Sequence, residues 1–108
     1  MKEEAIRLEK LKKLFKLQQY IRDFFTSKNF IDVQTPPMVQ NPGMETHIHP
    51  FQIKSAHHNK DLDLFLHTSP EFAMKKILAK SDLQDIFTLT YCFRDEPKSD
   101  THRNQFIM

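Results

Sequence analysis

The C-terminal stretch Tyr91-Cys-Phe-Arg-Asp-Glu-Pro-Lys-Ser-Asp-Thr-His-Arg-Asn-Gln-Phe-Ile-Met108 decides how this chain can fold. An apolar run ends at Phe93, and the charged triplet Arg94-Asp95-Glu96 follows at once. After a polar loop, the sequence turns apolar again at Phe106. A strand, a polar loop and a second strand in that order predict an antiparallel hairpin with charged side chains at its mouth.

The mouth of this hairpin has two interpretations. Arg94 stands at a strand end, opposite His102 and Arg103 in the loop. Because a guanidinium fork matches two phosphate oxygens at once, this arrangement suits a polyphosphate ligand. Hairpins with charged loops are also common on protein surfaces, where the same side chains simply face water. The spacing of the residues leaves both interpretations open.

Upstream of the hairpin, the sequence predicts a long helix, several short strands and a second helix. In residues 3–27, apolar residues recur every three or four positions between charged and polar ones. This apolar stripe faces either the protein's own core or a partner subunit. Asn29 can take a left-handed cap after the helix. The other expected elements are strands at 30–35, 47–54, 62–67 and 85–93, loops at 38–46 and 55–61, and a helix from Pro70 to about Ala79. The predicted fold class is α+β, with an antiparallel set of strands.

Strand-ending and helix-starting residues support two of these boundaries. Pro36-Pro37 ends the first strand, because neither proline can donate to a β-ladder. The triplet Ser69-Pro70-Glu71 begins the second helix. Ser69 can cap free amides, and Pro70 fits the first helical position. A carboxylate such as Glu71 is favourable at the positive end of the helix.

Composition limits the classes of function. The chain of 108 residues has room for one domain, and its 39% apolar and 28% charged residues allow a globular core. Gly43 is the only glycine, which excludes a Walker loop or a GxGxxG turn within this sequence. Cys92 is the only cysteine, so no internal disulfide forms and a reducing cytoplasm is the expected location. A charged N-terminus without an apolar segment predicts no signal peptide and no contact with a membrane.

Four histidines could suggest a zinc site: His47, His49, His57 and His58. Their spacing fits no closed zinc site, and no cysteine lies near them. We therefore expect no metal ion bound by the protein alone.

Three stretches in order resemble the class II aminoacyl-tRNA synthetases of the lysine, aspartate and asparagine branch. Phe30-Ile-Asp-Val-Gln-Thr-Pro-Pro-Met38 resembles motif 1, and Leu66-His-Thr-Ser-Pro-Glu-Phe-Ala-Met-Lys75 resembles the segment that opens the amino-acid pocket. Phe93-Arg-Asp-Glu96, followed by His102 and Phe106, resembles motif 2. Within this branch, the chain is most similar to lysyl-tRNA synthetase and to the lysine ligases that modify elongation factor P.

The resemblance implies a partial catalytic domain over residues 1–108, with a long helix and part of the antiparallel sheet of the class II fold. Motif 1 would span about residues 15–38 and motif 2 about residues 86–108. The implied reaction is ATP-dependent activation of an amino acid, lysine in the nearest relatives, and its transfer to elongation factor P or to a tRNA. Homodimerisation through the motif 1 region is also implied. The sequence has no basic stripe suited to tRNA, which favours the protein acceptor.

The resemblance also assigns roles to individual residues. Arg94 would be catalytic, holding the α-phosphate of ATP and the substrate carboxylate. Phe106 would stack on adenine. The remaining implied ATP contacts are Asp95, Glu96 at the adenine end, and His102 or Arg103 at the outer phosphates. Mg²⁺ would bridge the phosphates.

The amino-acid pocket would be lined by Ser69, Pro70 and Glu71, with Glu71 accepting the substrate ammonium. Plainer interpretations remain for three of the assigned residues. Glu71 could serve only as a helix N-terminal carboxylate, and Phe106 only as a core residue. Ser69 caps the helix in either case.

The sequence departs from the family pattern in two places. Where motif 2 usually has Asn-Pro-Glu or Gln-Pro-Glu before its last phenylalanine, this chain has Arg103-Asn104-Gln105. The glycine-rich motif 3, which carries an arginine, is absent from these residues, so about half of the implied ATP site is missing. Two expectations follow: a portion of a complete ligase, or a non-catalytic binding and dimerisation module. A sheet that ends at Met108 would leave an apolar edge.

Overall fold

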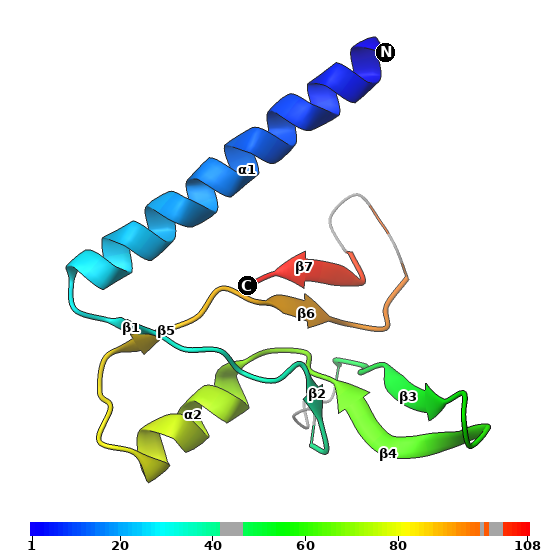
Figure 1. Cartoon of the computed structure of the whole chain (residues 1–108). Coiled ribbons are helices and arrows are strands. Elements are labelled where there is room, and N and C mark those ends of the chain that lie inside the picture. Colours follow the sequence, from blue (N-terminus) through cyan, green and yellow to red (C-terminus); the bar gives the residue numbers. More distant parts are fainter. Residues whose placement is uncertain (42–46, 98, 100–102) are drawn as a thin grey trace. The chain divides into compact units, whose positions relative to one another are not determined.

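A computed structural model describes residues 1–41, 47–97, 99 and 103–108 (Figure 1). The chain divides into two compact units, one of Met1–Val33 with Asp85–Phe87 and one of Gln34–Gln84 with Thr88–Met108. The first unit contains a helix and two strands, and the second contains a helix and five strands. The predicted α+β class is confirmed. In the part of the chain that the structure describes, no helix is both long and apolar enough to cross a membrane.

Helix α1 (Lys2–Ser27) dominates the first unit. Its sequence contains no glycine or proline, and Leu, Lys, Glu and Gln are good helix formers. Glu3 and Glu4 lie in the first turn, where negative charge is favourable. Along the exposed surface, Gln19 donates a hydrogen bond of 2.8 Å to the Asp23 carboxylate one turn later. The helix predicted over 3–27 is therefore confirmed to within a residue.

The C-terminus of α1 is closed by a Schellman motif centred on Asn29. Asn29 has a φ angle of 66°, the left-handed conformation predicted for it. Its N–H bonds to the Thr26 carbonyl at 3.0 Å, and the Phe30 N–H bonds to the Phe25 carbonyl at 3.0 Å. The Phe25 and Phe30 rings meet edge to face at 5.3 Å, the apolar contact that accompanies this motif. The chain thus enters strand β1 at a fixed angle.

Strand β1 (Ile31–Asp32) pairs with β5 (Ile86–Phe87), and the pairing is parallel. The prediction of an antiparallel set of strands is wrong for this pair. The Phe87 ring stacks on Phe25 at 5.0 Å between ring centres, so an apolar contact from α1 anchors β5 beside β1. Arg22 and Asp32 add an ion pair of 2.6 Å between α1 and β1.

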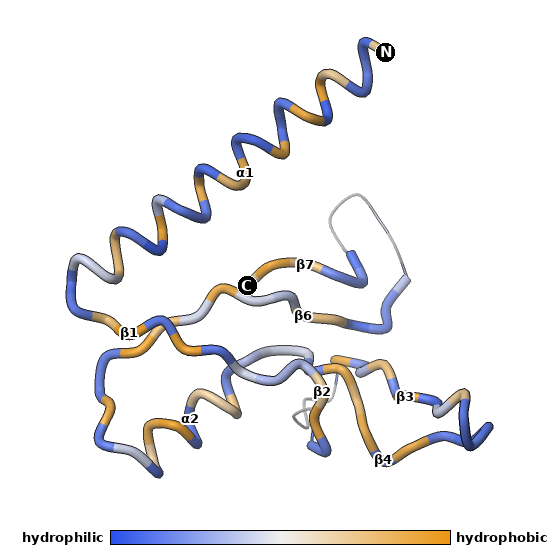
Figure 2. Tube along the Cα trace, in the orientation of Figure 1, coloured by the Kyte–Doolittle hydropathy of each residue, from blue (hydrophilic) through white to orange (hydrophobic). Residues whose placement is uncertain are grey.

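Within the first unit, most of the apolar stripe of α1 is exposed, and only its C-terminal end packs, through Phe25 on Phe30 and Phe87. None of its residues is buried, and Phe15 is 59% exposed. Figure 2 shows hydrophobic and hydrophilic residues alternating along the whole helix. The contacts within the first unit account for the Phe25 end of the stripe, and both interpretations of the remainder stay predictions. The exposed large apolar residues of α1 are Ile6, Leu8, Leu11, Leu14, Phe15, Leu17, Tyr20 and Phe24.

The second unit is built on a three-stranded antiparallel sheet in the order β2-β4-β3. Its strands are β2 (Met38–Val39), β3 (Gln52–Ser55) and β4 (Lys60–Leu66). Strand β2 corrects the sequence prediction, which treated 38–46 as loop. Its two residues pair with Leu66 and Phe65, so a partner strand that is remote in sequence supplies the regularity. Residues 42–46 of the predicted loop lie outside the described residues.

Helix α2 (Glu71–Lys80) follows β4 and begins one residue after the predicted first helical position, because Pro70 is the N-cap. The Ser69 hydroxyl accepts the Glu71 N–H at 3.1 Å, which satisfies one of the free amides of the first turn. Ser81 ends the helix by donating its hydroxyl to the Ile77 carbonyl at 2.6 Å. These local contacts place Ser69 and Glu71 at the start of α2.

The strand predicted over 85–93 is two strands in different units. Strand β5 belongs to the first unit, and β6 (Tyr91–Phe93) pairs antiparallel with β7 (Gln105–Ile107) in the second. Phe87 and Cys92 are buried while Tyr91 is exposed, so the predicted alternation does not continue through the segment. The hairpin itself is confirmed: Cys92 lies opposite Phe106, and Phe93 lies opposite Gln105.

Candidate functional site

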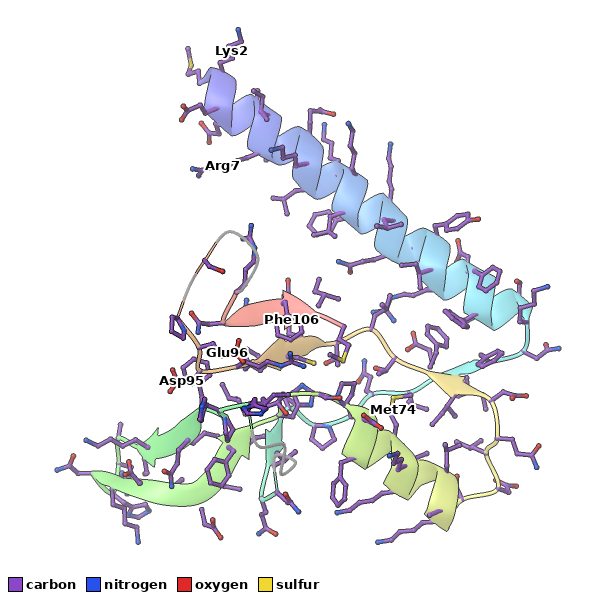
Figure 3. All side chains as sticks on the ribbon, turned by 180° about the vertical axis from the view of Figure 1, so that it is seen from behind. Lys2, Arg7, Met74, Asp95, Glu96 and Phe106 are labelled. Atoms are coloured by element: carbon purple, nitrogen blue, oxygen red, sulfur yellow. The ribbon has the colours of Figure 1, made fainter. Side chains whose placement is uncertain are left out.

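The mouth of the β6–β7 hairpin brings together Arg94 and Phe106. The central carbon of the Arg94 guanidinium lies 5.0 Å from the centre of the Phe106 ring, a cation–π contact. The Arg94 Nε is buried and has no hydrogen-bond partner among the described residues. An unpaired guanidinium N–H gains free energy from any anionic acceptor that comes within reach. Figure 3 shows Phe106 on β7 and Glu96 and Asp95 just beyond β6.

Asn104 holds the backbone at this mouth. Its side-chain nitrogen donates to the Arg94 carbonyl at 2.8 Å and to the Glu96 carbonyl at 2.7 Å. The Arg94 N–H in turn donates to the Asn104 carbonyl at 2.9 Å. In the sequence, Asn104 is recognisable only as a departure from the family pattern, and this role cannot be predicted there. Its partners are backbone carbonyls, which leave no pattern in a sequence.

His67 joins the hairpin to the three-stranded sheet. Its side chain is 2% exposed, and Nε2 lies 2.6 Å from the Tyr91 carbonyl. Since a carbonyl oxygen only accepts, Nε2 carries the proton in this bond. The His67 backbone accepts from the Phe93 N–H at 3.1 Å and donates to the Pro37 carbonyl at 2.8 Å. From the sequence, His67 is expected only as the last residue of a strand, with no individual role.

Cys92 lies on β6, after Tyr91, which accepts a hydrogen bond from His67, and before Arg94 at the hairpin mouth. It is fully buried, and burial raises the pKa of its thiol, an effect that the positive charge of Arg94 partly opposes. A buried neutral thiol behaves as a small apolar side chain. Cys92 therefore belongs to the packing beneath the hairpin, opposite Phe106.

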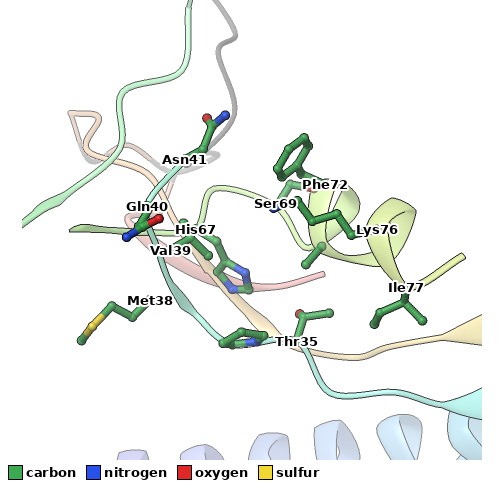
Figure 4. A pocket seen from close by; sticks show the side chains of 12 residues that line it. Thr35, Met38, Val39, Gln40, Asn41, His67, Ser69, Phe72, Lys76 and Ile77 are labelled. Atoms are coloured by element: carbon green, nitrogen blue, oxygen red, sulfur yellow. The ribbon is translucent and has the colours of Figure 1, made fainter. Parts of the chain in front are cut away.

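A pocket of about 480 Å³ opens between strand β2, the segment after β4 and one face of α2 (Figure 4). Ser69 lines it, as predicted for an amino-acid pocket, together with Phe72 and Lys76. Pro70 and Glu71, predicted to share this pocket, do not line it. Around the axis of α2, Glu71 points away from the face that carries Ala73 and Ile77, which line the cavity. The other lining residues are Thr35, Pro36, Met38, Val39, Gln40, Asn41 and His67.

Glu71 points to solvent and forms an ion pair with Lys75. The Lys75 nitrogen lies 2.9 Å from the Glu71 carboxylate, and both side chains are well exposed. The pair joins residues four apart on α2, a spacing that brings side chains together on one helix face. The carboxylate predicted to receive a substrate ammonium thus already holds an ammonium of its own chain.

The remaining predicted nucleotide contacts are distributed around the same loop. Asp95 is exposed, and its N–H donates to the His49 carbonyl at 2.7 Å. Glu96 is half-buried, and Arg103 is exposed next to Asn104. His102 lies outside the described residues.

A comparison with known protein families decides the ancestry. The family described as tRNA synthetases class II (D, K and N) matches residues 3–108. The chain belongs to this family. The class II resemblance inferred from the three sequence stretches is therefore confirmed.

Curated relatives in this family include ligases of elongation factor P. The chain is 37% identical over 90 residues to the elongation factor P–(R)-beta-lysine ligase of Klebsiella pneumoniae subsp. pneumoniae. The aligned region covers 82% of this chain and 27% of that ligase. The chain is 33% identical over 88 residues to the ligase homologue of Aquifex aeolicus, covering 82% and 30%. The ligase of Pseudoalteromonas translucida is 37% identical over 90 residues, covering 82% and 28%. The chain thus spans less than a third of these class II relatives.

Metal ions are the last feature that the class II resemblance implies. Among the described residues, no group of three or more His, Cys, Asp or Glu side chains could hold a metal ion. These residues do not fit a metal site made by the protein alone. Mg²⁺ is usually bound through phosphates and one or two carboxylates, so it would arrive with the phosphates of ATP.

Proposed function

We propose that this chain binds the nucleotide and the amino acid in an ATP-dependent ligase that activates lysine or a close analogue. In this reaction, a carboxylate oxygen of the amino acid attacks the α-phosphorus of ATP. The bond from that phosphorus to the β-phosphate oxygen breaks, and pyrophosphate leaves. The aminoacyl group then passes to an amine of the acceptor, and AMP is released.

The observation that carries the proposal is the Arg94–Phe106 pair at the hairpin mouth. A fixed cation beside an aromatic face suits a nucleotide, because the cation pairs with phosphate and the ring stacks on a base. Arg94 would neutralise charge on the α-phosphate as it develops during attack. Phe106 would stack on adenine. Phe106 lies on β7 and Arg94 directly follows β6, so the hairpin and the Arg94 N–H bond to the Asn104 carbonyl set their separation.

Four further residues extend the nucleotide contacts in the proposal. Glu96 would accept a hydrogen bond from the adenine amino group, and Asp95 would lie near the phosphates. Arg103 would reach the outer phosphates, aided by His102. Arg103 is exposed in the described structure, which is compatible with a long side chain that closes on its ligand.

The amino acid would be recognised by Glu71 and Ser69 at the start of α2. Glu71 holds the Lys75 ammonium at 2.9 Å, which supports the proposal that it can hold a substrate ammonium. Ser69 lines the pocket, and its hydroxyl accepts the Glu71 N–H at 3.1 Å; Pro70 stands between the two residues in the sequence. Elongation factor P is the proposed acceptor, because curated relatives are named as its (R)-beta-lysine ligases. The buried free thiol of Cys92 is compatible with the reducing cytoplasm that we propose for the reaction.

Titration of the 108-residue chain with ATP and magnesium in a calorimeter tests the proposal. We expect saturable heat with the parent chain and at least a tenfold loss of affinity in Arg94→Ala, because a charge-assisted hydrogen bond contributes about 1.5–3 kcal/mol. Arg7→Ala, which removes the same side chain from α1, is the matched control. A folded parent chain that gives no heat with ATP contradicts the proposal. Lysine-dependent exchange of pyrophosphate into ATP then tests the chemical step.

A second candidate function is dimerisation through α1, and the exposed stripe of that helix favours it. A stripe of large apolar side chains is normally covered, since exposed apolar area costs about 25 cal/mol per Å². The proposed occupant is the same helix of a second copy. Sedimentation equilibrium should report dimers for the parent chain and monomers for the double variant Leu11→Glu, Phe15→Glu. Lys13→Glu introduces the same side chain on the polar face and should remain dimeric. A monomeric parent chain at high concentration contradicts this function.

A further inference from the structure

The corner formed by Arg94, Asp95 and Glu96 is held by hydrogen bonds to its backbone. The Glu96 N–H bonds to the Arg94 carbonyl at 3.1 Å, which makes the corner tight. The Asp95 N–H is taken by the His49 carbonyl at 2.7 Å, and the Arg94 N–H by the Asn104 carbonyl at 2.9 Å. Each backbone N–H of the corner therefore has a hydrogen-bond partner. Backbone groups that are paired in this way resist movement.

One side chain supplies the bonds to the corner's first and last carbonyls. The Asn104 amide nitrogen lies 2.8 Å from the Arg94 oxygen and 2.7 Å from the Glu96 oxygen. Both bonds are partly buried, so water replaces them poorly. A primary amide nitrogen has two N–H groups, one for each carbonyl. A carboxylate of the same shape has no donor and would repel both oxygens.

We propose that Asn104 is a positioning residue for the nucleotide: its side-chain amide fixes the corner from which Arg94 and Glu96 reach ATP. This inference rests on the proposed function. Asn104 itself touches no reacting atom in this proposal. It holds the Cα atoms of the two contact residues at a set distance, so the guanidinium and the carboxylate meet opposite ends of one ligand without further ordering.

The two bonds from the Asn104 amide to the Arg94 and Glu96 carbonyls form what we call the Asn104 clamp. The clamp predicts a specific set of responses to substitution. Asn104→Ala removes both side-chain bonds and should weaken binding of ATP by about 10- to 100-fold, because each lost bond corresponds to about a tenfold effect or less. Asn104→Asp should be at least as weak as Asn104→Ala, because its carboxylate faces two carbonyl oxygens. Gln105→Ala removes the neighbouring amide, which lies exposed on β7, and should bind ATP as the parent chain does.

The experiment measures three dissociation constants by calorimetry for the parent chain and these three variants: for ATP with magnesium, for adenosine and for lysine. Affinity for ATP and for adenosine should fall in both Asn104 variants, because Arg94 and Glu96 are displaced together. Affinity for lysine should fall less than affinity for ATP, because Arg94 would contact the lysine carboxylate while the proposed contacts of Ser69 and Glu71 stay in place. A general loss of structure would lower all three alike, so this split separates positioning from stability. Equal ATP affinity in Asn104→Ala and Gln105→Ala overturns the proposal.

Amide hydrogen exchange on the parent chain gives a test that needs no variant to fold. The two side-chain Nδ2 protons of Asn104 should exchange at least tenfold more slowly than those of the exposed Asn29, since both are hydrogen-bonded. Exchange at the rate of Asn29 shows that the clamp does not exist and overturns the proposal. Slow exchange in a parent chain that binds no ATP leaves the clamp standing as a structural feature, and overturns both its role in positioning and the proposed function.

Discussion

The Arg94 guanidinium lies over the Phe106 ring at 5.0 Å, across the two strands of one hairpin, and this contact connects the sequence to its proposed ligand. The residue opposite Phe106 in the ladder is Cys92, two positions before Arg94. The side chain of Arg94 therefore reaches back along the strand to cover the ring. Without ATP, the Arg94 guanidinium covers one face of the Phe106 ring, the side chain that is also proposed to stack on adenine.

Replacing Phe106 by leucine should separate stacking from simple burial. Leucine keeps an apolar side chain in the ladder but loses the π-face, and base–aromatic stacking is worth about 1–3 kcal/mol. We expect affinity for ATP to fall by about 5- to 100-fold in Phe106→Leu and to change little in Phe106→Tyr. Calorimetric titration with ATP measures both. Equal affinity in the leucine variant would show that Phe106 serves only in packing.

The Glu71–Lys75 ion pair should compete with a substrate ammonium. Exposed pairs of this spacing contribute about 0.3–0.5 kcal/mol, so freeing Glu71 should have a small effect. Lys75→Met is therefore expected to tighten binding of lysine by about twofold, and Glu71→Gln to weaken it strongly. Lys80→Met, at the far end of α2, is the control for the loss of one charge. Weaker lysine binding in Lys75→Met would mean that Lys75 assists the substrate rather than competing with it.

Local signals in the sequence predicted the helices and the hairpin well. The three- and four-residue spacing of apolar residues predicted α1, and Asn29 adopts the left-handed conformation that its residue type favours. Pairing partners were harder to predict. An alternating run over 85–93 does not reveal that the chain changes units after Phe87, because alternation describes each strand and not its neighbour.

The candidate site was predictable where it depends on hairpin register. Arg94 and Phe106 flank one loop, so the expectation of a hairpin already placed them near each other. Asn104 and His67 were missed because each binds backbone carbonyls, and any residue type could provide those. The separation of Glu71 from the pocket was missed for a similar reason. The triplet Ser69-Pro70-Glu71 is contiguous in sequence, but successive helical side chains point in different directions.

His67 should be needed for the stability of the second unit. Its Nε2–H donates to the Tyr91 carbonyl at 2.6 Å in a partly buried hydrogen bond. A typical hydrogen bond contributes about 0.5–1.5 kcal/mol to stability. His67→Leu should lower the free energy of unfolding by about that amount in urea denaturation followed by circular dichroism. His57→Leu, in the exposed turn between β3 and β4, is the matched control. Equal urea midpoints for the two variants would show that the bond contributes nothing measurable.

Cys92 should make stability fall at alkaline pH. Burial raises the pKa of its thiol above the ordinary value of 9.0, despite the opposing charge of Arg94. The folded chain therefore keeps its thiol proton at a pH where the unfolded chain has lost it. Ionisation favours the unfolded state from about the unfolded pKa upward, until the folded thiol also ionises. The stabilisation is complete below the unfolded pKa and is lost as pH rises through the folded one.

Urea midpoints at pH 7, 9 and 10 should thus decline more steeply in the parent chain than in Cys92→Ala. The alanine variant starts lower, because it leaves a small cavity beneath Phe106, but it has no thiol to ionise. The comparison of slopes removes the contribution of lysine and tyrosine side chains, which both chains share. Slow alkylation of the native parent chain at pH 8 would agree with a buried, protonated thiol. Parallel pH dependences in the two chains would contradict the raised pKa and would show that the Arg94 charge offsets the burial of Cys92.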